Sequence, residues 1–142
     1  MTCNETQSRE NTHAEMKAKR KLILDAFDNK VVDRVPVGFW WHFADEYRQF
    51  RGLMDDGIIQ ATIDGTKKMY DDLKPDMAKV MSDGFFGHPS IMENDINTID
   101  DIKKIKSIGA SSPWYDKQVD MLNEILKHFN GEIAAFYNIF AP

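Results

Sequence analysis

The stretch that decides the fold is residues 31–43, which read VVDRVPVGFWWHF. A short connector ends at Pro36, and a compact apolar run over residues 37–41 follows it. The run is too short for a helix, and proline is tolerated at the start of a strand, so this run predicts a buried β-strand. The elements on either side decide what kind of sheet this strand joins.

A helix is expected immediately before this strand. Thr12 and Glu15 form a capping-box pattern, and apolar residues recur at helical spacing from there to about Asn29. Residues 1–11 are polar and show no apolar periodicity, so we expect them to form a disordered leader. Folding is therefore expected to start at residue 12.

Helical and strand patterns continue to alternate after the first strand. Ser112 with Pro113 is a typical helix start, and Asn130 with Gly131 is a typical helix end. The pattern predicts helices over residues 44–51, 58–73, 98–105 and 112–129, and strands over residues 77–81 and 133–139. The last of these helices is expected to have one apolar face, formed by Tyr115, Val119, Leu122, Ile125, Leu126 and Phe129.

This alternation predicts an α/β fold with parallel strands joined by right-handed helical crossovers. A closed eight-stranded βα-barrel needs about 250 residues, whereas this chain has 142. We therefore expect a partial TIM (β/α) barrel of about three parallel strands, in which residues 12–142 form the N-terminal portion of a larger domain. A complete three-stranded α/β binding domain is the structural alternative.

The composition excludes several classes of function. The formal net charge is -5 with acidic and basic residues interspersed, so the chain offers no basic surface for a nucleic acid. No run approaches the ~20 apolar residues that cross a bilayer, and the first residues lack the apolar core of a signal peptide. The single cysteine, Cys3, excludes a disulfide framework. We therefore expect a cytoplasmic protein with neither a membrane nor a nucleic acid as partner.

Functional groups of parallel βα proteins gather at the carboxyl ends of the strands, where the loops converge. Asp83 lies at such an end, where its carboxylate could hold a cationic or NH-bearing substrate or act as a general base. An equally weighted alternative is that Asp83 caps its own turn through local backbone hydrogen bonds. The other strand-end residues are expected to bind a small-molecule substrate and comprise Trp41, His42, Phe85, Phe86, His88 and Asn138.

Imidazole and carboxylate groups occur together at these strand ends. His42, His88 and Asp83 have donor types that suit zinc, but their spacing matches no local ligand motif. We therefore predict packing or hydrogen bonding for the histidines and no metal site. The chain also lacks a glycine-rich phosphate loop, a G-x-S-x-G elbow and an H-E-x-x-H helix, so nucleotide binding and serine hydrolysis have no local support.

Three short stretches resemble the uroporphyrinogen decarboxylase family: residues 32–37 (VDRVPV), residues 74–83 (KPDMAKVMSD) and residues 133–142 (IAAFYNIFAP). The resemblance implies a βα-barrel. It also implies one of two activities, either the carboxy-lyase reaction of porphyrin biosynthesis or corrinoid-linked methyl transfer. For a decarboxylase, the resemblance implies that Asp83 polarises pyrrole NH groups of the substrate.

The chain departs from the decarboxylase pattern after its first strand. The decarboxylases of this family carry arginines there that hold substrate carboxylates, whereas this chain has Trp41, His42 and Asp45. Arg48 and Arg51 lie further along, in a segment that we expect to be helical, which makes them poor substitutes. We therefore expect this chain to be incomplete as a catalyst by itself, and we expect the full-length protein to catalyse methyl transfer or another decarboxylase-like reaction rather than porphyrinogen decarboxylation.

The remaining expectations concern cofactors and partners. No cofactor is evident in this chain, and the resemblance implies zinc and a corrinoid only where a methyltransferase-like C-terminal part follows. The exposed edge of the third strand predicts self-association or pairing with a second chain. The alternative to a catalyst is therefore a non-catalytic fragment, or a subunit that needs a second chain to complete the barrel.

Overall fold

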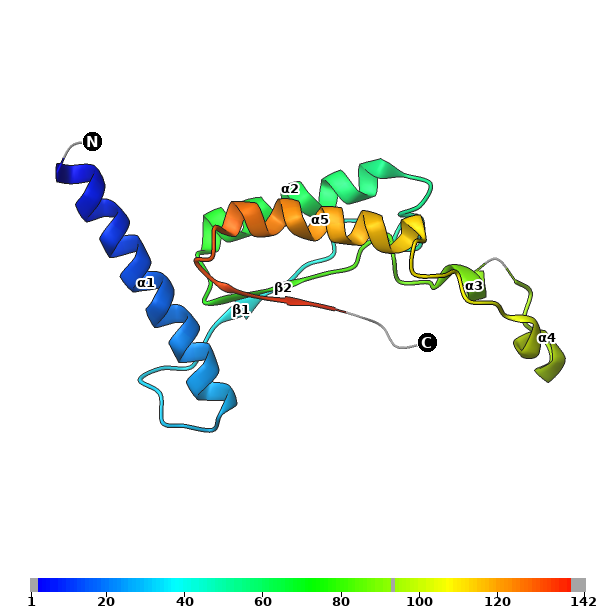
Figure 1. The fold of residues 1–142 in the computed structure, drawn as a ribbon, viewed down its shortest axis with the longest axis horizontal. Coiled ribbons are helices and arrows are strands. Elements are labelled where there is room, and N and C mark those ends of the chain that lie inside the picture. The colour runs from blue at the N-terminus through cyan, green and yellow to red at the C-terminus, as the bar shows by residue number, and fades with distance from the viewer. Residues whose placement is uncertain (1–2, 93, 139–142) are drawn as a thin grey trace.

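Three parallel strands form a sheet with the order β1-β2-β3, so β2 is the central strand (Figure 1). The computed structural model describes residues 3–92 and 94–138, with side chains from residue 14 onward except that of Met16. The strands are β1 (Gly38–Phe39), β2 (Met77–Val80) and β3 (Ala134–Tyr137). The predicted α/β fold with parallel strands is confirmed. The predicted end of the third strand at Ile139 lies outside the described residues.

Two long helices cover one face of this sheet. These are α2 (Asp56–Leu73) and α5 (Pro113–Phe129), which lie side by side (Figure 1). Because side chains alternate along a strand, Ala78 and Val80 face these helices, while Met77 and Lys79 face the other side of the sheet. The main hydrophobic core comprises Ile63, Met69, Tyr70, Ala78, Val80, Met121, Ile125, Phe129 and Ile133.

Caps fix both ends of α2 and α5. The Asp55 carboxylate accepts a hydrogen bond from the backbone in the first turn of α2 (3.0 Å), and Ser112 caps α5 with Pro113 at its start. Lys74 and Asn130 end the two helices in the left-handed conformation. The predicted start and end of the last helix are therefore confirmed.

Helix α1 (Cys3–Phe27) starts earlier than the sequence predicts. The predicted start at Thr12 is wrong, because the helical backbone also includes residues 3–11, which we expected to form a disordered leader. Starting a helix is costly, whereas each residue added to an existing helix gains one backbone hydrogen bond. A helix can therefore continue through polar residues once its packed turns have formed. Those packed turns contain Leu22 and Ile23, which are both buried.

Residues 44–51 do not form the helix that their sequence predicts. They form consecutive turns, and the N–H groups of Arg48, Arg51 and Met54 each donate to the carbonyl three residues earlier (2.9 Å in each case). The Asp45 carboxylate also accepts a hydrogen bond from the Arg48 N–H (3.0 Å). A side chain that bonds its nearby backbone competes with helix formation, and this segment has no continuous apolar stripe to offset that competition.

Two short helices, α3 (Pro89–Met92) and α4 (Ile99–Lys104), extend away from the sheet (Figure 1). α4 is the short helix predicted over residues 98–105, and the Thr98 and Asp101 side chains form its capping box. α3 lies in a run that the sequence predicts to be turns. Within residues 3–92 and 94–138, no helix is both long and apolar enough to span a membrane.

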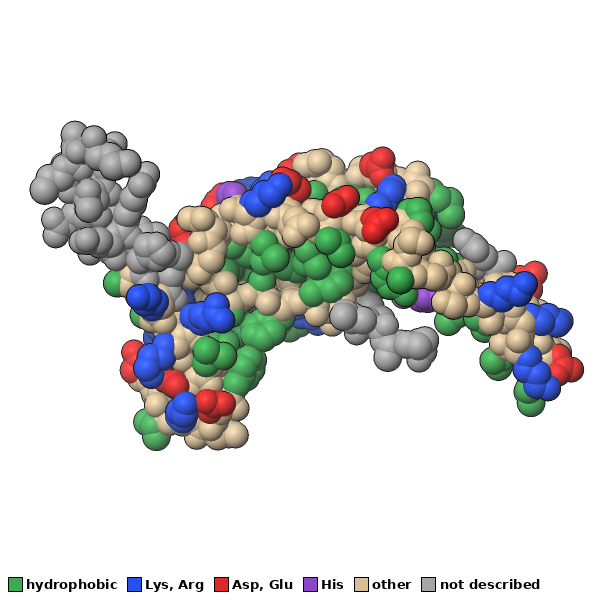
Figure 2. All heavy atoms as spheres, in the orientation of Figure 1, with side chains coloured by type: hydrophobic (Ala, Val, Ile, Leu, Met, Phe, Trp, Pro, Cys, Tyr) green, Lys and Arg blue, Asp and Glu red, His purple; other side chains and the backbone are tan. Residues whose placement is uncertain are grey.

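Helix α5 has two apolar faces rather than the single face that its sequence predicts. Met121, Ile125 and Phe129 are buried against α2 and the sheet. Val119 and Leu126, which we expected on the same buried face, are 53% and 45% exposed. Figure 2 shows hydrophobic side chains gathered on the exposed side of this helix. The two faces are adjacent around the helix, so the apolar periodicity of the sequence could not distinguish them from one broad face.

The residues that the structure describes leave the other face of the sheet largely uncovered. A shallow cavity of about 190 Å³ lies on it, lined by Phe27, Gly38, Phe39, Trp40, Met77, Lys79 and Phe136. The Lys79 Nζ atom lies 5.1 Å from the centre of the Trp40 ring, which is a cation–π distance. Phe27, at the end of α1, contacts Phe136 of β3 edge-on, with 5.5 Å between the ring centres. Helix α1 therefore covers only one end of this face.

Candidate functional site

The carboxyl ends of β1 and β2 bring two of the predicted site residues together. His42 lies just beyond β1, and Asp83 lies just beyond β2. Because the two strands are parallel neighbours, the loops that follow them meet at the same edge of the sheet. The His42 Nδ1 atom lies 2.8 Å from Oδ1 of Asp83.

Asp83 is fully buried, and its carboxylate holds the loop that follows β1. Its Oδ2 atom accepts hydrogen bonds from the N–H groups of Phe43 (2.6 Å) and Ala44 (3.2 Å). The turn of Asp83 itself is closed by a backbone bond from the Phe85 N–H to the Ser82 carbonyl (2.8 Å). Asp83 therefore caps a neighbouring loop, and among the described residues it does not cap its own turn.

His42 is the accessible member of the pair. Its side chain is 42% exposed, whereas the Asp83 side chain has no exposed surface. A carboxylate beside Nδ1 favours the tautomer in which Nδ1 is the donor and Nε2 is free to accept a proton. A substrate can reach His42 but not the Asp83 carboxylate, so the direct substrate contact that we predicted for Asp83 does not fit its burial.

The loop that carries His42 packs closely against α2. A Cβ atom at Gly65 of α2 would come within 2.1 Å of the Phe43 ring. Real side chains do not approach that closely, so a glycine in the middle of this helix lets the ring of Phe43 lie against the helix backbone. The position of His42 is thus fixed from two sides, by Asp83 and by α2.

Two of the other predicted binding residues lie away from this pair. Trp41 stacks on Phe39, with 5.7 Å between the ring centres. Asn138 is partly buried beyond the end of β3, where its N–H donates to the Val80 carbonyl (3.3 Å). Neither side chain takes part in the pair formed by His42 and Asp83.

Phe85 and His88 pack around Trp114 at the start of α5. Phe85 is 2% exposed, and its ring lies edge-on to Trp114 at 6.2 Å. The ring of His88 lies 5.3 Å from that of Trp114, and its Nδ1 atom accepts a hydrogen bond from the Ser90 N–H (3.3 Å). These two predicted binding residues therefore belong to a packed aromatic cluster.

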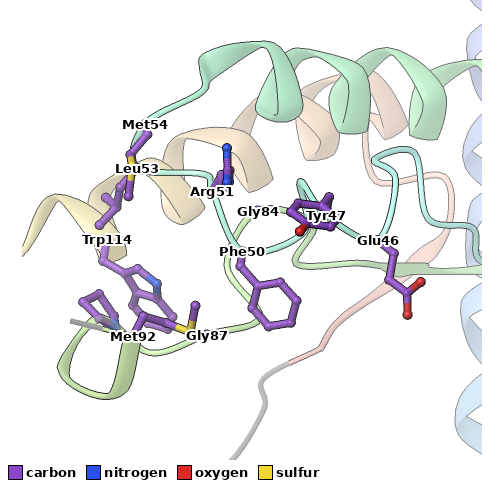
Figure 3. A pocket seen from close by; sticks show the side chains of 11 residues that line it. Glu46, Tyr47, Phe50, Arg51, Leu53, Met54, Gly84, Gly87, Met92 and Trp114 are labelled. Carbon is purple, nitrogen blue, oxygen red and sulfur yellow. The ribbon is translucent and has the colours of Figure 1, made fainter. Parts of the chain in front are cut away.

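Phe86 links the histidine to a larger cleft. Its ring lies edge-on to His42 at 5.4 Å and edge-on to Phe50 at 6.1 Å. Phe50 in turn lines a cleft of about 530 Å³, formed by the turns after β1, the turn after β2 and the start of α5 (Figure 3). That volume falls in the range of small-molecule sites, about 300–1,000 Å³.

None of the predicted site residues lines this cleft. Its walls comprise Glu46, Tyr47, Phe50, Arg51, Leu53, Met54, Gly84, Gly87, Pro89, Met92 and Trp114. Sequence reasoning missed it because it predicted a helix for the polar residues 44–51. The signal that could have revealed it is the set of large apolar residues in a polar segment, namely Tyr47, Phe50 and Met54.

The two arginines of this segment have different partners. Arg48 donates from Nε and Nη2 to Oδ2 of Asp55, at 3.1 and 2.9 Å. These hydrogen bonds hold the pKa of Asp55 below its ordinary value. Arg51 has no carboxylate partner among the described residues, and its guanidinium carbon lies 5.9 Å from the centre of the Tyr47 ring.

The described residues contain no group of three or more His, Cys, Asp and Glu side chains that could hold a metal ion. The combination of His42, His88 and Asp83 is not assembled, because His88 contacts Trp114 and Ser90 instead. These residues therefore do not fit the donor set of a zinc site.

No protein-family model matches the chain. No curated protein and no solved structure matches it either. The resemblance to a family and the roles of individual residues therefore depend on the sequence and the geometry described above.

Proposed function

We propose that this chain is the N-terminal part of a uroporphyrinogen decarboxylase-like βα-barrel in which His42 transfers a proton to or from a small-molecule substrate. The parallel strand order and the helices on one face support the barrel. The second apolar face of α5 supports it further, because an outer helix of a barrel packs against a neighbour on each side. In this proposal the uncovered face of the sheet lines the inside of the barrel.

The observation that carries the functional proposal is the pair formed by His42 and Asp83. The buried carboxylate is held by two backbone N–H groups and itself faces Nδ1 of the imidazole. A histidine that is oriented in this way is a suitable general acid or base, because Nδ1 is fixed by Asp83 and Nε2 has no hydrogen-bond partner among the residues that the structure describes. His42 is thus the proposed catalytic residue, and Asp83 is the residue that positions it.

The surroundings of this pair argue against uroporphyrinogen as the substrate. Trp41 and Asp45 occupy the stretch in which the resemblance implies arginines, and Arg48 is already paired with Asp55. Arg48 is therefore occupied, and Arg51, unpaired among the described residues, lines the separate cleft instead of contacting the pair formed by His42 and Asp83. The proposed reaction is therefore methyl transfer or another decarboxylase-like reaction on a smaller molecule. Zinc and a corrinoid belong to the methyl-transfer version alone and would be held by other segments.

Two assays test this proposal on the full-length protein, purified from the cells that produce it together with any bound partner chain. The first follows decarboxylation of uroporphyrinogen, and the second follows methyl transfer from methylcobalamin to a thiol. We expect no uroporphyrinogen turnover, and we expect the methyl-transfer rate to fall at least roughly 100-fold in His42→Gln, the size of a general acid–base contribution. The control is His128→Gln on α5, which pairs with Asp71 and should retain full activity. Robust uroporphyrinogen turnover or a fully active His42→Gln protein would refute the proposal.

A second candidate is a non-catalytic subunit that needs a second chain to complete its barrel. The specific observation is that β3 pairs only with β2 within the described part of the chain, so no strand pairs with its other edge, although helix α1 contacts β3. The exposed apolar face of α5 lies beside that edge (Figure 2). A bare strand edge next to apolar surface favours association with further strands.

The purified chain is therefore expected to self-associate. Light scattering coupled to size-exclusion chromatography should give a mass larger than one chain. Changing both Val119 and Leu126 to glutamate should shift the population toward monomers, because charge on this face opposes apolar association. The matched control is Lys127→Glu, which reverses one exposed charge outside the apolar face and so changes the net charge by the same amount. A stable, monodisperse wild-type monomer would argue against any missing part.

A further inference from the structure

We infer that the cleft between the turns after β1 and the start of α5 binds a small aromatic monocarboxylate, with its ring against Trp114 and Phe50 and its carboxylate at Arg51. This cleft is separate from the pair formed by His42 and Asp83, so a ligand can bind here whatever reaction that pair catalyses.

The walls of the cleft suit a flat apolar group. Phe50, Met92 and Trp114 come from three different segments and face the same space (Figure 3). Met54 and Met92 are 86% and 56% exposed, and a methionine thioether adapts its shape to an aromatic ring. Burying these exposed side chains against a ligand removes apolar surface from water, which is the main source of affinity in such sites.

Arg51 supplies the charge that selects an anion. The neighbouring cations are neutralised, since Arg48 pairs with Asp55 and Lys117 pairs with Asp56 at 2.6 Å. Arg51 has no such partner among the described residues and lies over the ring of Tyr47. A guanidinium presents parallel N–H groups whose geometry matches both oxygens of a carboxylate.

Trp114 provides a second donor that the chain leaves unmatched. Its indole Nε1 is buried and has no hydrogen-bond partner within the described residues. Its ring contacts include those with Phe85, His88 and Tyr115. A buried donor without an acceptor is costly, so an oxygen on a bound ligand would relieve that cost.

Glu46 limits how much negative charge the ligand can carry. Figure 3 shows Glu46 at one end of the cleft, beyond Tyr47, with its carboxylate directed away from Arg51. Glu46 therefore leaves Arg51 unpaired, but it would repel a second anionic group at its own end. A monocarboxylate fits this distribution of charge better than a polycarboxylate.

Two probes of the same shape test the inference, namely 2-naphthoate and its neutral counterpart 2-naphthamide. The chain has three tryptophans, so its nitrogen–proton NMR spectrum contains three indole signals that Trp→Phe variants can assign. We expect 2-naphthoate to shift the Trp114 signal in a saturable way and to leave the Trp40 signal unchanged. We expect 2-naphthamide to bind roughly ten-fold more weakly, because it cannot form the charge-assisted hydrogen bonds.

Arg51→Gln should lower the affinity for 2-naphthoate roughly ten-fold and leave the affinity for 2-naphthamide unchanged. The matched control is Lys68→Gln, which removes the same charge from the exposed face of α2 and should change neither affinity. The rest of the NMR spectrum shows in each case that the variant is folded. The inference is overturned by equal affinity for the two probes, by a Trp114 signal that stays unchanged while the probe saturates another site, or by absence of binding.

Discussion

Replacing Asp83 with alanine is expected to lower the free energy of unfolding by about 3 kcal/mol, because it removes a buried acceptor from several donors at once. The N–H groups of Phe43 and Ala44 would lose their partner, and so would Nδ1 of His42. Of these donors, the Ala44 N–H lies on a buried residue, where water cannot replace the lost bond. Urea denaturation followed by circular dichroism measures the change.

Two further variants separate the role of Asp83 from a general effect of removing charge. Asp83→Asn keeps the size of the side chain and one acceptor oxygen, so it should lower the free energy of unfolding by less than Asp83→Ala does. Asp72→Ala removes an exposed carboxylate that pairs with Lys68, and its effect should stay within about 0.5 kcal/mol. If Asp83→Ala costs no more than Asp72→Ala, then the hydrogen bonds of Asp83 do not hold the loop that carries His42.

The sheet and its covering helices could be predicted because the signals that specify them are local. The apolar run around Val80 and the cap formed by Ser112 and Pro113 are each contained within a few residues. Alternation of such elements implies parallel strands whatever the distant contacts are. The predictions based on these signals were confirmed.

The parts that could not be predicted depend on contacts between distant segments. The turns after β1 are held by Gly52, whose N–H donates to the Gly84 carbonyl (2.7 Å), and by Gln49, whose carbonyl accepts from the Phe86 N–H (3.2 Å). Each bond joins residues that are far apart in the sequence, so a local pattern could not show that these turns replace a helix. The cleft was missed for the same reason, since its walls come from these turns, α3 and α5.

The candidate site was predicted in its location but not in its detail. Strand-end reasoning placed His42 and Asp83 at the same edge of the sheet, and the structure joins them by a hydrogen bond. Sequence alone could not show which of the two is buried, because that depends on the path of the loop after β1. The carboxylate faces the backbone of that loop, so the imidazole became the exposed group.

Asp76 is expected to give the second large loss of stability. Its carboxylate accepts two hydrogen bonds from Arg34, at 2.5 and 2.6 Å, and one from the Val37 N–H, at 2.9 Å. These bonds tie the connector before β1 to the start of β2, which gives a physical role to the VDRVPV stretch. Asp76→Ala should lower the free energy of unfolding by about 2 kcal/mol, since the partly buried bond from the Val37 N–H is lost while the half-exposed Arg34 is solvated again. Arg34→Ala should cost more, because it leaves the buried carboxylate without its cation.

The pH dependence of stability distinguishes this ion pair from simple packing. The hydrogen bonds from Arg34 hold the pKa of Asp76 below its ordinary value, although burial opposes the shift. Because the folded pKa lies below the unfolded one, the stabilisation is fully present above about pH 4 and is lost as the pH falls through the folded value. Urea denaturation of wild type and Asp76→Asn is measured between roughly pH 7 and pH 2.5. The difference between their free energies of unfolding should be constant at first and should then shrink as the pH falls. A difference that stays the same down to the lowest pH would mean that the charge of Asp76 contributes nothing, and that the connector is held by packing alone.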